Sequence, residues 1–350
     1  MKPIFKKLSW KHKNNRVLYY VINFARQLIP SKIFQLRLER KMSTIKDFDI
    51  DYIRKRVNYY NKSETNTTLS DNAKSLENFK LKRKGKSYFF DSYEYTRYFQ
   101  SSLRADFTFG DVIHVPDEPS IVKSRPINGN NLNSVILNLD KLRHFTFTND
   151  KKDFRKKKNM LVSRNNATQV HRLKFLEMYI NHPLCNIGKI NKNGDHQNLL
   201  KEIMTIEEQL DYKFILCIEG HDVASNLKWV MSSNTLAVMP VPKYETWYME
   251  GMLIPNYHYM LIKDDYSDLE ERMEYYINHA DEALEIIRNA HLYIEQFKIK
   301  QREDLISLLV LEKYFYKTSQ KKISENLKLL LSPENQILIP PPLVNRQSGK

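Results

Sequence analysis

The segment from Tyr212 to Lys263 constrains the fold of this chain more than any other part of the sequence. It predicts a strand, a turn of small residues, a short helix over 223–232, a second strand and, later, a third. Gly220, Ala224 and Ser225 lie where the first strand gives way to the helix. In α/β proteins such a junction is where phosphate-bearing ligands bind, because backbone amides there face the ligand.

This turn also has a simpler explanation. A capped strand–helix connection is common, and Asp222 or Ser225 could cap the helix over 223–232. In the ligand-binding interpretation, Asn226 and Lys228 would add side-chain donors to a diphosphate. The turn alone leaves both explanations open.

The charge of the chain points to an anionic partner. Its 350 residues are 41% hydrophobic and carry a formal net charge of +15, which suits nucleic acid, anionic lipid or a nucleotide-sugar. Residues 1–41 hold eleven Lys or Arg and one acid, Glu39, so their net charge is 11 − 1 = +10. A basic helix on a membrane surface and an ordinary solvated basic face both explain this segment. A second basic run lies at 151–158.

Other features exclude several protein classes. Two cysteines, Cys185 and Cys217, allow neither a disulfide framework nor a cysteine metal cage, and they fit a reducing cytoplasm. No apolar run reaches the roughly 18 residues of a membrane span. The short apolar segment 17–25 contains Asn23 and is followed by Arg26 rather than a small-residue cleavage site, so we predict no signal peptide.

The first half of the chain predicts a small α/β domain. A polar stretch at 61–75 predicts a loop, and the aromatic-rich stretch at 86–100 fits a strand or a helix. DVIHV, at 111–115, predicts a strand that ends at the turn PDEP.

The second half begins with a strand at MLV (160–162), which the tripeptide SRN and a helix over 171–180 follow. Ser267 and Glu270 have the spacing of a capping box at the start of a further helix. Helical periodicity continues to about Tyr316, and the proline-rich tail after Leu331 predicts poor order.

Two groups of residues in these segments could carry chemistry. Asp117 or Glu118 in PDEP could act as a general base, with Arg125 nearby to hold the carboxylate or a sugar phosphate. An ordinary solvated turn explains PDEP equally simply. Ser163 and Arg164, with Arg172 further on, suit phosphate or ribose, although helix capping by Asn165 with exposed arginines is the alternative. The acidic run DDYSD at 264–268 lacks metal-site spacing, so we predict no metal.

The run from KFILCIEGHDVASNLKW through LIKDDYSDLEE, together with GDVIHVPDEPSIVKSRPI, resembles glycosyltransferase family 90. The likeness is strong over about 160–300 and greatest to the family's bacterial lipopolysaccharide glycosyltransferases. It implies a GT-B architecture, in which two Rossmann-like domains face each other across a cleft. It also implies transfer from a UDP-sugar with inversion and without a bound metal or other cofactor.

The resemblance assigns roles to individual positions. Asp117 matches the family's catalytic aspartate in a V-x-D-x-P context, with Glu118 as an adjacent alternative. Asn226 stands where some relatives carry arginine. The residues that match the UDP-sugar site are Ser163, Arg164, Arg172, Gly220, Val223, Ala224, Ser225, Asn226 and Lys228.

The resemblance leads to a domain scheme. We expect an acceptor-side domain with the catalytic aspartate at 46–155 and a UDP-sugar-binding domain at 156–300. The flanking parts are a basic lead segment at 1–45, helices at 301–330 that could return to the first domain, and a flexible tail at 331–350.

The predicted activity is transfer of a hexose, glucose or galactose, from a UDP-sugar to a lipopolysaccharide core acceptor. We place it at the cytoplasmic face of the inner membrane, with an anionic membrane surface as a further partner. The alternatives are another glycan or protein acceptor, an inactive glycosyltransferase-like binding protein, and a nucleic-acid-binding protein. No recognised nucleic-acid-binding motif is present, so we expect no nucleic-acid partner.

Overall fold

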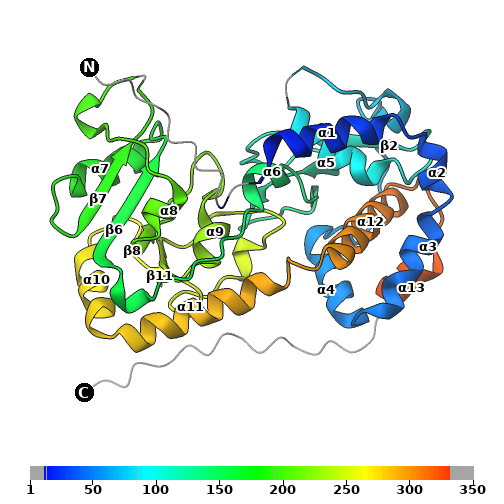
Figure 1. Ribbon diagram of the computed structural model, residues 1–350. Coiled ribbons are helices and arrows are strands. Elements are labelled where there is room, and N and C mark those ends of the chain that lie inside the picture. Colours follow the sequence, from blue (N-terminus) through cyan, green and yellow to red (C-terminus); the bar gives the residue numbers. More distant parts are fainter. Residues whose placement is uncertain (1–11, 13, 84, 193, 332–350) are drawn as a thin grey trace.

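The computed structural model describes residues 12, 14–83, 85–192 and 194–331, and it shows a mixed α/β chain (Figure 1). The elements as far as α6 lie on the right in Figure 1, whereas those from β6 to α10 lie on the left. Helix α11 runs along the lower edge, and α12 returns to the right. Two sheets consist mainly of parallel strands, which confirms the predicted α/β class.

The first sheet has the strand order β1-β2-β3-β5. Strands β2, β3 and β5 are parallel, and β1 is antiparallel to β2. The elements around this sheet are α1 (Arg16–Gln27), α2 (Ser31–Gln35), α3 (Leu38–Met42), α4 (Ile50–Tyr60), β1 (Lys74–Ser75), α5 (Lys86–Thr96), β2 (Arg104–Thr108), β3 (Ser120–Val122), β5 (Ser134–Ile136) and α6 (Lys141–His144).

The second sheet is parallel throughout and has the order β11-β9-β8-β6-β7. All five residues of β8 are buried, as the apolar run YKFIL predicts for a strand with both faces covered. Its elements are β6 (Lys158–Asn165), α7 (Val170–Tyr179), β7 (Cys185–Lys189), α8 (Ile206–Gln209), β8 (Tyr212–Leu216), α9 (Leu227–Met231), β9 (Leu236–Met239), β11 (Met260–Leu261), α10 (Leu269–Asn278) and α11 (Ala280–Glu295).

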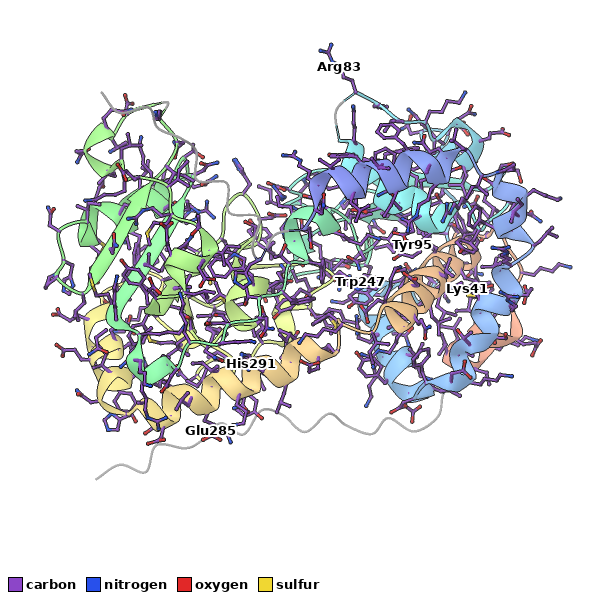
Figure 2. All side chains as sticks on the ribbon, viewed as in Figure 1. Lys41, Arg83, Tyr95, Trp247, Glu285 and His291 are labelled. Atoms are coloured by element: carbon purple, nitrogen blue, oxygen red, sulfur yellow. The ribbon has the colours of Figure 1, made fainter. Side chains whose placement is uncertain are left out.

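The polypeptide joins the two halves at several points. A short antiparallel ribbon pairs β4 (Arg125–Pro126) with β10 (Tyr244–Glu245). Helix α12 (Lys300–Lys317) packs on α4 and α5, and α13 (Glu325–Leu331) packs on α4. Trp247, which Figure 2 places between the halves, stacks on Tyr60 with ring centroids 3.8 Å apart and donates a hydrogen bond to Glu303. These contacts continue one hydrophobic core from the first half into the second.

Some predicted elements differ from the structure. The aromatic stretch at 86–100 forms helix α5, but DVIHV is not a strand, because the strand ends earlier, at Thr108. The helix predicted over 223–232 is shorter and begins at Leu227 without a side-chain cap. The predicted capping box is wrong as well, since the Ser267 hydroxyl donates to Asp265 instead.

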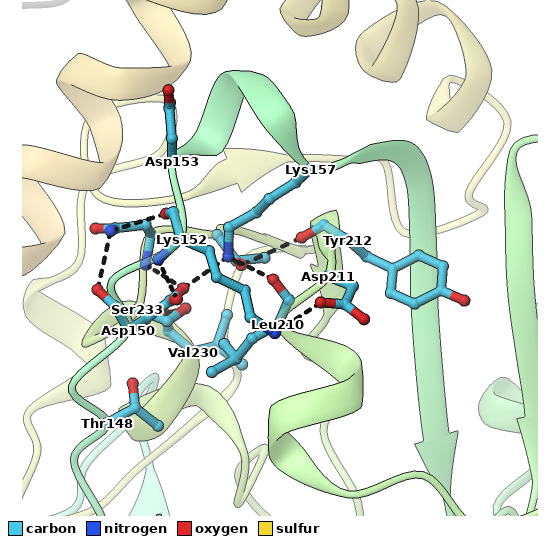
Figure 3. A network of polar contacts seen from close by, with 12 residues as sticks. Thr148, Asp150, Lys152, Asp153, Lys157, Leu210, Asp211, Tyr212, Val230 and Ser233 are labelled. Carbon is cyan, nitrogen blue, oxygen red and sulfur yellow. Dashed lines mark hydrogen bonds and ion pairs between the residues drawn. The ribbon is translucent and has the colours of Figure 1, made fainter.

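The basic run at 151–158 is built partly into the base of the second sheet (Figure 3). Lys157 is buried and donates to Asp150, to the Leu210 carbonyl and to the Thr235 hydroxyl at 2.6–2.8 Å. Lys152 pairs with Asp211 at 2.6 Å. These lysines therefore brace the connection into β6.

Helices long and apolar enough to cross a bilayer do not occur among the described residues. The tail predicted to be poorly ordered, at 332–350, and the first residues of the basic lead segment, 1–11 and 13, lie outside the described residues.

Candidate functional site

A cavity of 750 Å³ lies where the carboxyl edges of the two parallel sheets meet. The first half contributes Asp111, which follows β2, and Arg143 and His144 from α6, which follows β5. The second half contributes the ends of β6 and β7 and the loop after β8. Carboxyl edges of parallel strands are the usual ligand sites of α/β folds. The lining residues from the second half include Ser163, Arg164, Asn165, Gln169, Arg172, Gly220, Asp222, Val223, Ser225 and Asn226.

Asp111 is held at the cavity by two cations. Its Oδ1 accepts from Lys123 and, at 2.9 Å, from Nη2 of Arg143. Burial alone would raise the pKa of Asp111, but the hydrogen bond from Lys123 and the charges of Lys123 and Arg143 outweigh it and lower this pKa. Asp111 is therefore an ionised carboxylate at neutral pH.

Lys123 connects the two halves at the cavity. It follows β3, its side chain is 1% exposed, and its Nζ lies 2.6 Å from Oδ2 of Asp222 in the loop after β8. The same ammonium group contacts Asp111. One buried cation thus joins a carboxylate from each half, and this arrangement fixes the two walls relative to each other.

His144 lines the cavity and carries a buried ring nitrogen without a protein partner. The side chain is buried, and burial together with the charges of Lys228, Lys123 and Arg143 lowers the pKa of His144 well below its usual value, so the ring is neutral. Nε2 accepts from Nε of Arg143 at 3.1 Å, which assigns the ring proton to Nδ1. Nδ1 is buried and has no partner in the protein.

The end of β6 carries further unpaired polar atoms. The Ser163 hydroxyl accepts from Nδ2 of Asn165 at 2.9 Å, which leaves Oδ1 of Asn165 without a partner. Oε1 of Gln169, before α7, is also buried and unpaired. Because buried polar groups in folded proteins are normally hydrogen-bonded, these acceptors indicate a polar ligand.

The two predicted arginines at this wall support the backbone. Arg164 donates to the carbonyls of Glu202, Ser163 and Asn186. Arg172 spans the next loop and donates to the carbonyls of Asn166, Ile218 and Glu219. Both line the cavity while holding its loops in place.

Arg172 closely approaches Gly220. A Cβ atom at residue 220 would lie 3.1 Å from Nη2 of Arg172, so a side chain there would displace the guanidinium group. Val223 and Ala224 follow in a buried turn, Ser225 is exposed, and Asn226 donates to the Leu216 carbonyl. The turn expected to bind a ligand is therefore at the cavity, as its sequence indicated.

A second cavity of 380 Å³ shares Gly220 and Val223 with the first and extends along β9 toward Tyr266. Glu219 lies in its wall and accepts from the backbone amides of Lys243 and Tyr244. Burial raises the pKa of Glu219 to about 7, despite these two hydrogen bonds. Glu219 is thus the cavity carboxyl that titrates near neutrality.

The positions of Arg125 and Lys228 differ from their predicted roles. Arg125 is fully buried, pairs with Glu245 at 2.8 Å and donates to the carbonyls of Tyr59, Tyr60 and Ser134. Lys228 is fully buried and pairs with Glu250. Both basic side chains belong to core ion pairs and line neither cavity, although Glu250 lines the smaller one, so neither Arg125 nor Lys228 is placed to contact a sugar phosphate.

Asp117 and Glu118 also lie away from these cavities. Asp117 is exposed in the turn before β3, at the amino end of that strand and hence at the opposite edge of the sheet from Asp111. Glu118 accepts from the backbone amide and hydroxyl of Ser70, both at 2.7 Å. Two carboxylates line the larger cavity, and Asp111 is the more exposed of them, since the side chain of Asp222 is buried against Lys123.

Sequence reasoning missed Asp111 and His144. Asp111 was the first residue of the predicted strand DVIHV, whereas it actually follows FTFG, where β2 gives way to a loop. His144 gave no signal of its own, because its role depends on Arg143 and on burial. Within the described chain, no group of three or more His, Cys, Asp or Glu side chains could hold a metal ion.

Comparison with known proteins agrees with this geometry. The family model described as "Glycosyl transferase family 90" matches residues 131–323. The chain is 43% identical over 263 residues to the O-glucosyltransferase LpsA of Dichelobacter nodosus, with 75% of this chain and 82% of that protein covered. The matched region includes the β6 and β8 loops that line the cavity. This chain is therefore a glycosyltransferase that belongs to family 90.

Proposed function

We propose that this enzyme transfers glucose from UDP-glucose to a saccharide of the lipopolysaccharide core, with inversion and with Asp111 as the general base. The observation that carries the proposal is the single cavity in which Asp111 faces the Ser163 and Gly220 loops from the opposite half. Glucose is favoured over galactose by the O-glucosyltransferase relative. Two Rossmann-like domains in a GT-B arrangement are the proposed description of the two halves.

The proposed reaction needs one carboxylate and one leaving group on opposite sides of the sugar. An acceptor hydroxyl attacks the anomeric carbon of glucose while Asp111 takes the hydroxyl proton. The new carbon–oxygen bond forms as the bond from the anomeric carbon to the diphosphate breaks, and UDP departs. The transition state resembles an oxocarbenium ion, as in glycoside hydrolysis. Asp111 is ionised at neutral pH, as a general base must be, while Lys123 and Arg143 lower its pKa and so reduce its basicity.

The leaving diphosphate would lie against the second half. Backbone amides in the turn from Gly220 to Asn226 and the cation of Arg172 are the proposed contacts on that wall. Arg143 adds a cation from the first half, and its side chain is 47% exposed. With these groups as the electrostatic stabilisation, we propose that no bound metal is required.

His144 and the unpaired acceptors of Asn165 and Gln169 are proposed to bind sugar or ribose hydroxyls. A hydroxyl both donates and accepts, so it satisfies the Nδ1 donor of His144 and the amide oxygens alike. In this proposal, the atoms that lack a hydrogen-bond partner in the protein form hydrogen bonds with the donor substrate.

The acceptor and the location follow from the name of the relative and from charge. A lipopolysaccharide core is phosphorylated and lipid-anchored, which fits the basic character of this chain and a position at the cytoplasmic face of the inner membrane. Another glycan or a protein is the alternative acceptor. Nucleic acid is not a proposed partner.

A screen of UDP-sugars against core oligosaccharides, read by mass, tests the proposal. We expect a single added hexose from UDP-glucose, and the anomeric coupling constant in NMR should show inversion. Activity should persist in chelator. Exclusive use of another nucleotide-sugar would contradict UDP-glucose as the donor. Retention of configuration would contradict the inverting mechanism, and a strict metal requirement would contradict the metal-independent one.

A further inference from the structure

Helix α1 lies on the first half with its apolar side facing outward. Its polar side chains face the protein: Asn23 is the buried residue of the helix, Tyr19 donates to Asp91, and Arg26 pairs with Glu94 at 3.0 Å. Surface helices normally bury their apolar side. In α1, Tyr20 and Phe24 pack on Phe90, but the rest of the apolar side faces outward.

The exposed side is continuous and uncharged. Spaced as one face of a helix, Val17, Val21 and Leu28 are 65%, 58% and 85% exposed. The surface extends into the next turn and into α2. We call it the α1–α2 apolar surface, and it consists of Val17, Leu18, Val21, Ile22, Phe24, Leu28, Ile29, Ile33 and Leu36. A set of this size is an interaction surface rather than scattered exposure.

Exposed basic side chains occur in the same stretch of the chain as this surface. Arg16, Lys32, Arg37, Arg40 and Lys41 are exposed, and Glu39 is the exposed acid among the described residues of this stretch up to Lys41. An apolar strip accompanied by basic residues is the composition of a helix that lies in the interface of an anionic bilayer. A symmetric contact with a second copy would bring these bases together, in a chain of net charge +15.

We infer that the α1–α2 apolar surface inserts into the headgroup region of an anionic lipid bilayer and seats the enzyme there. The apolar side chains enter the boundary between headgroups and acyl chains, while the basic side chains of the same stretch contact lipid phosphates. Neither α1 nor α2 crosses the membrane in this arrangement, since α1 has 12 residues and α2 has 5.

The α1–α2 apolar surface lies near the main cavity, as an enzyme acting on a lipid-anchored acceptor would need. This point rests on the proposed function. A cavity of 440 Å³ is lined by Asn14, Arg16 and Tyr20 at the start of α1 and by Arg143 and Ser225 of the main cavity. A saccharide attached to lipid could reach Asp111 along this path.

Vesicle binding tests the inference without donor or acceptor, so its outcome is independent of the transferase proposal. The full chain is sedimented with vesicles of equal parts phosphatidylglycerol and phosphatidylcholine, and with phosphatidylcholine alone. We expect binding to the anionic vesicles that weakens with salt. The variant Val21→Glu/Leu28→Glu should bind roughly tenfold less or worse, because it places charge in the apolar strip.

Leu292→Glu is the matched control, since Leu292 is 66% exposed on α11. It should bind as the wild type does, and thermal unfolding should show all variants folded. Equal binding by Val21→Glu/Leu28→Glu, or equal binding to both vesicle types, would overturn the inference. So would a wild-type dimer in light scattering that this variant converts to a monomer, because the surface would then be a contact between copies.

Discussion

Lys123 and Asp222 form a buried ion pair across the two halves of the enzyme, with 2.6 Å between the ammonium nitrogen and the carboxylate oxygen. The same lysine contacts Asp111, the proposed base. A pair so fully removed from water stabilises the fold only while both partners are present. The contact therefore links the integrity of the fold to the position of the catalytic carboxylate.

Lys123→Met should destabilise the enzyme by about 3–5 kcal/mol, because Asp222 and Asp111 would lose a buried counter-charge. Urea denaturation measures this change. Adding Asp222→Asn to the variant should restore part of the loss, since the uncompensated charge is removed. If the two losses simply add, the pair does not interact as the structure indicates.

Glu219→Gln should change how stability depends on pH. The pKa of Glu219 is raised to about 7 in the folded enzyme, against about 4.3 in an unfolded chain. The folded state then holds the proton more tightly, so the contribution of Glu219 to stability is full below about pH 4.3 and is lost as pH rises to about 7.

Thermal unfolding of the wild type and of Glu219→Gln across this range provides the measurement. Relative to the variant, the wild type should lose up to about 3 kcal/mol between these pH values. Glutamine keeps one oxygen to accept from the amides of Lys243 and Tyr244, so the variant should remain folded. Parallel stability curves would contradict the raised pKa.

His144→Phe should weaken donor binding by roughly two- to tenfold, the range for one net hydrogen bond of about 0.5–1.5 kcal/mol. The variant also removes the Nε2 acceptor of Arg143, but the Arg143 side chain is 47% exposed and water can replace that acceptor, so the loss of stability should be small. Calorimetric titration with UDP-glucose, compared with UDP, measures the effect. An unchanged affinity for both ligands would exclude His144 from the donor site.

Sequence reasoning located the second half of the site well. The largely apolar YKFIL and Gly220 four residues later indicated a buried strand with a turn at its carboxyl end, and Gly220 lines both cavities. The helix boundary was wrong because Val223 and Ala224, which extended the apolar periodicity, are buried in the turn instead.

The first half was harder because its determinants are non-local. DVIHV was predicted to form a strand, but the strand that pairs with β3 is the preceding segment Arg104–Thr108. Lys228 was similarly expected to contact a ligand, because it is a basic residue close to the turn. Its ion pair with Glu250, 22 residues later in the chain, shows that it belongs to the core.

The choice between Asp111 and Asp117 is the central claim, and turnover of the two asparagine variants tests it most directly. Asp111→Asn should leave UDP binding intact and lower kcat by roughly 10²–10⁴, the usual contribution of a general base. Asp117→Asn, in an exposed turn, should keep nearly normal kcat. Near-normal turnover of Asp111→Asn, or a loss confined to Asp117→Asn, would contradict this account.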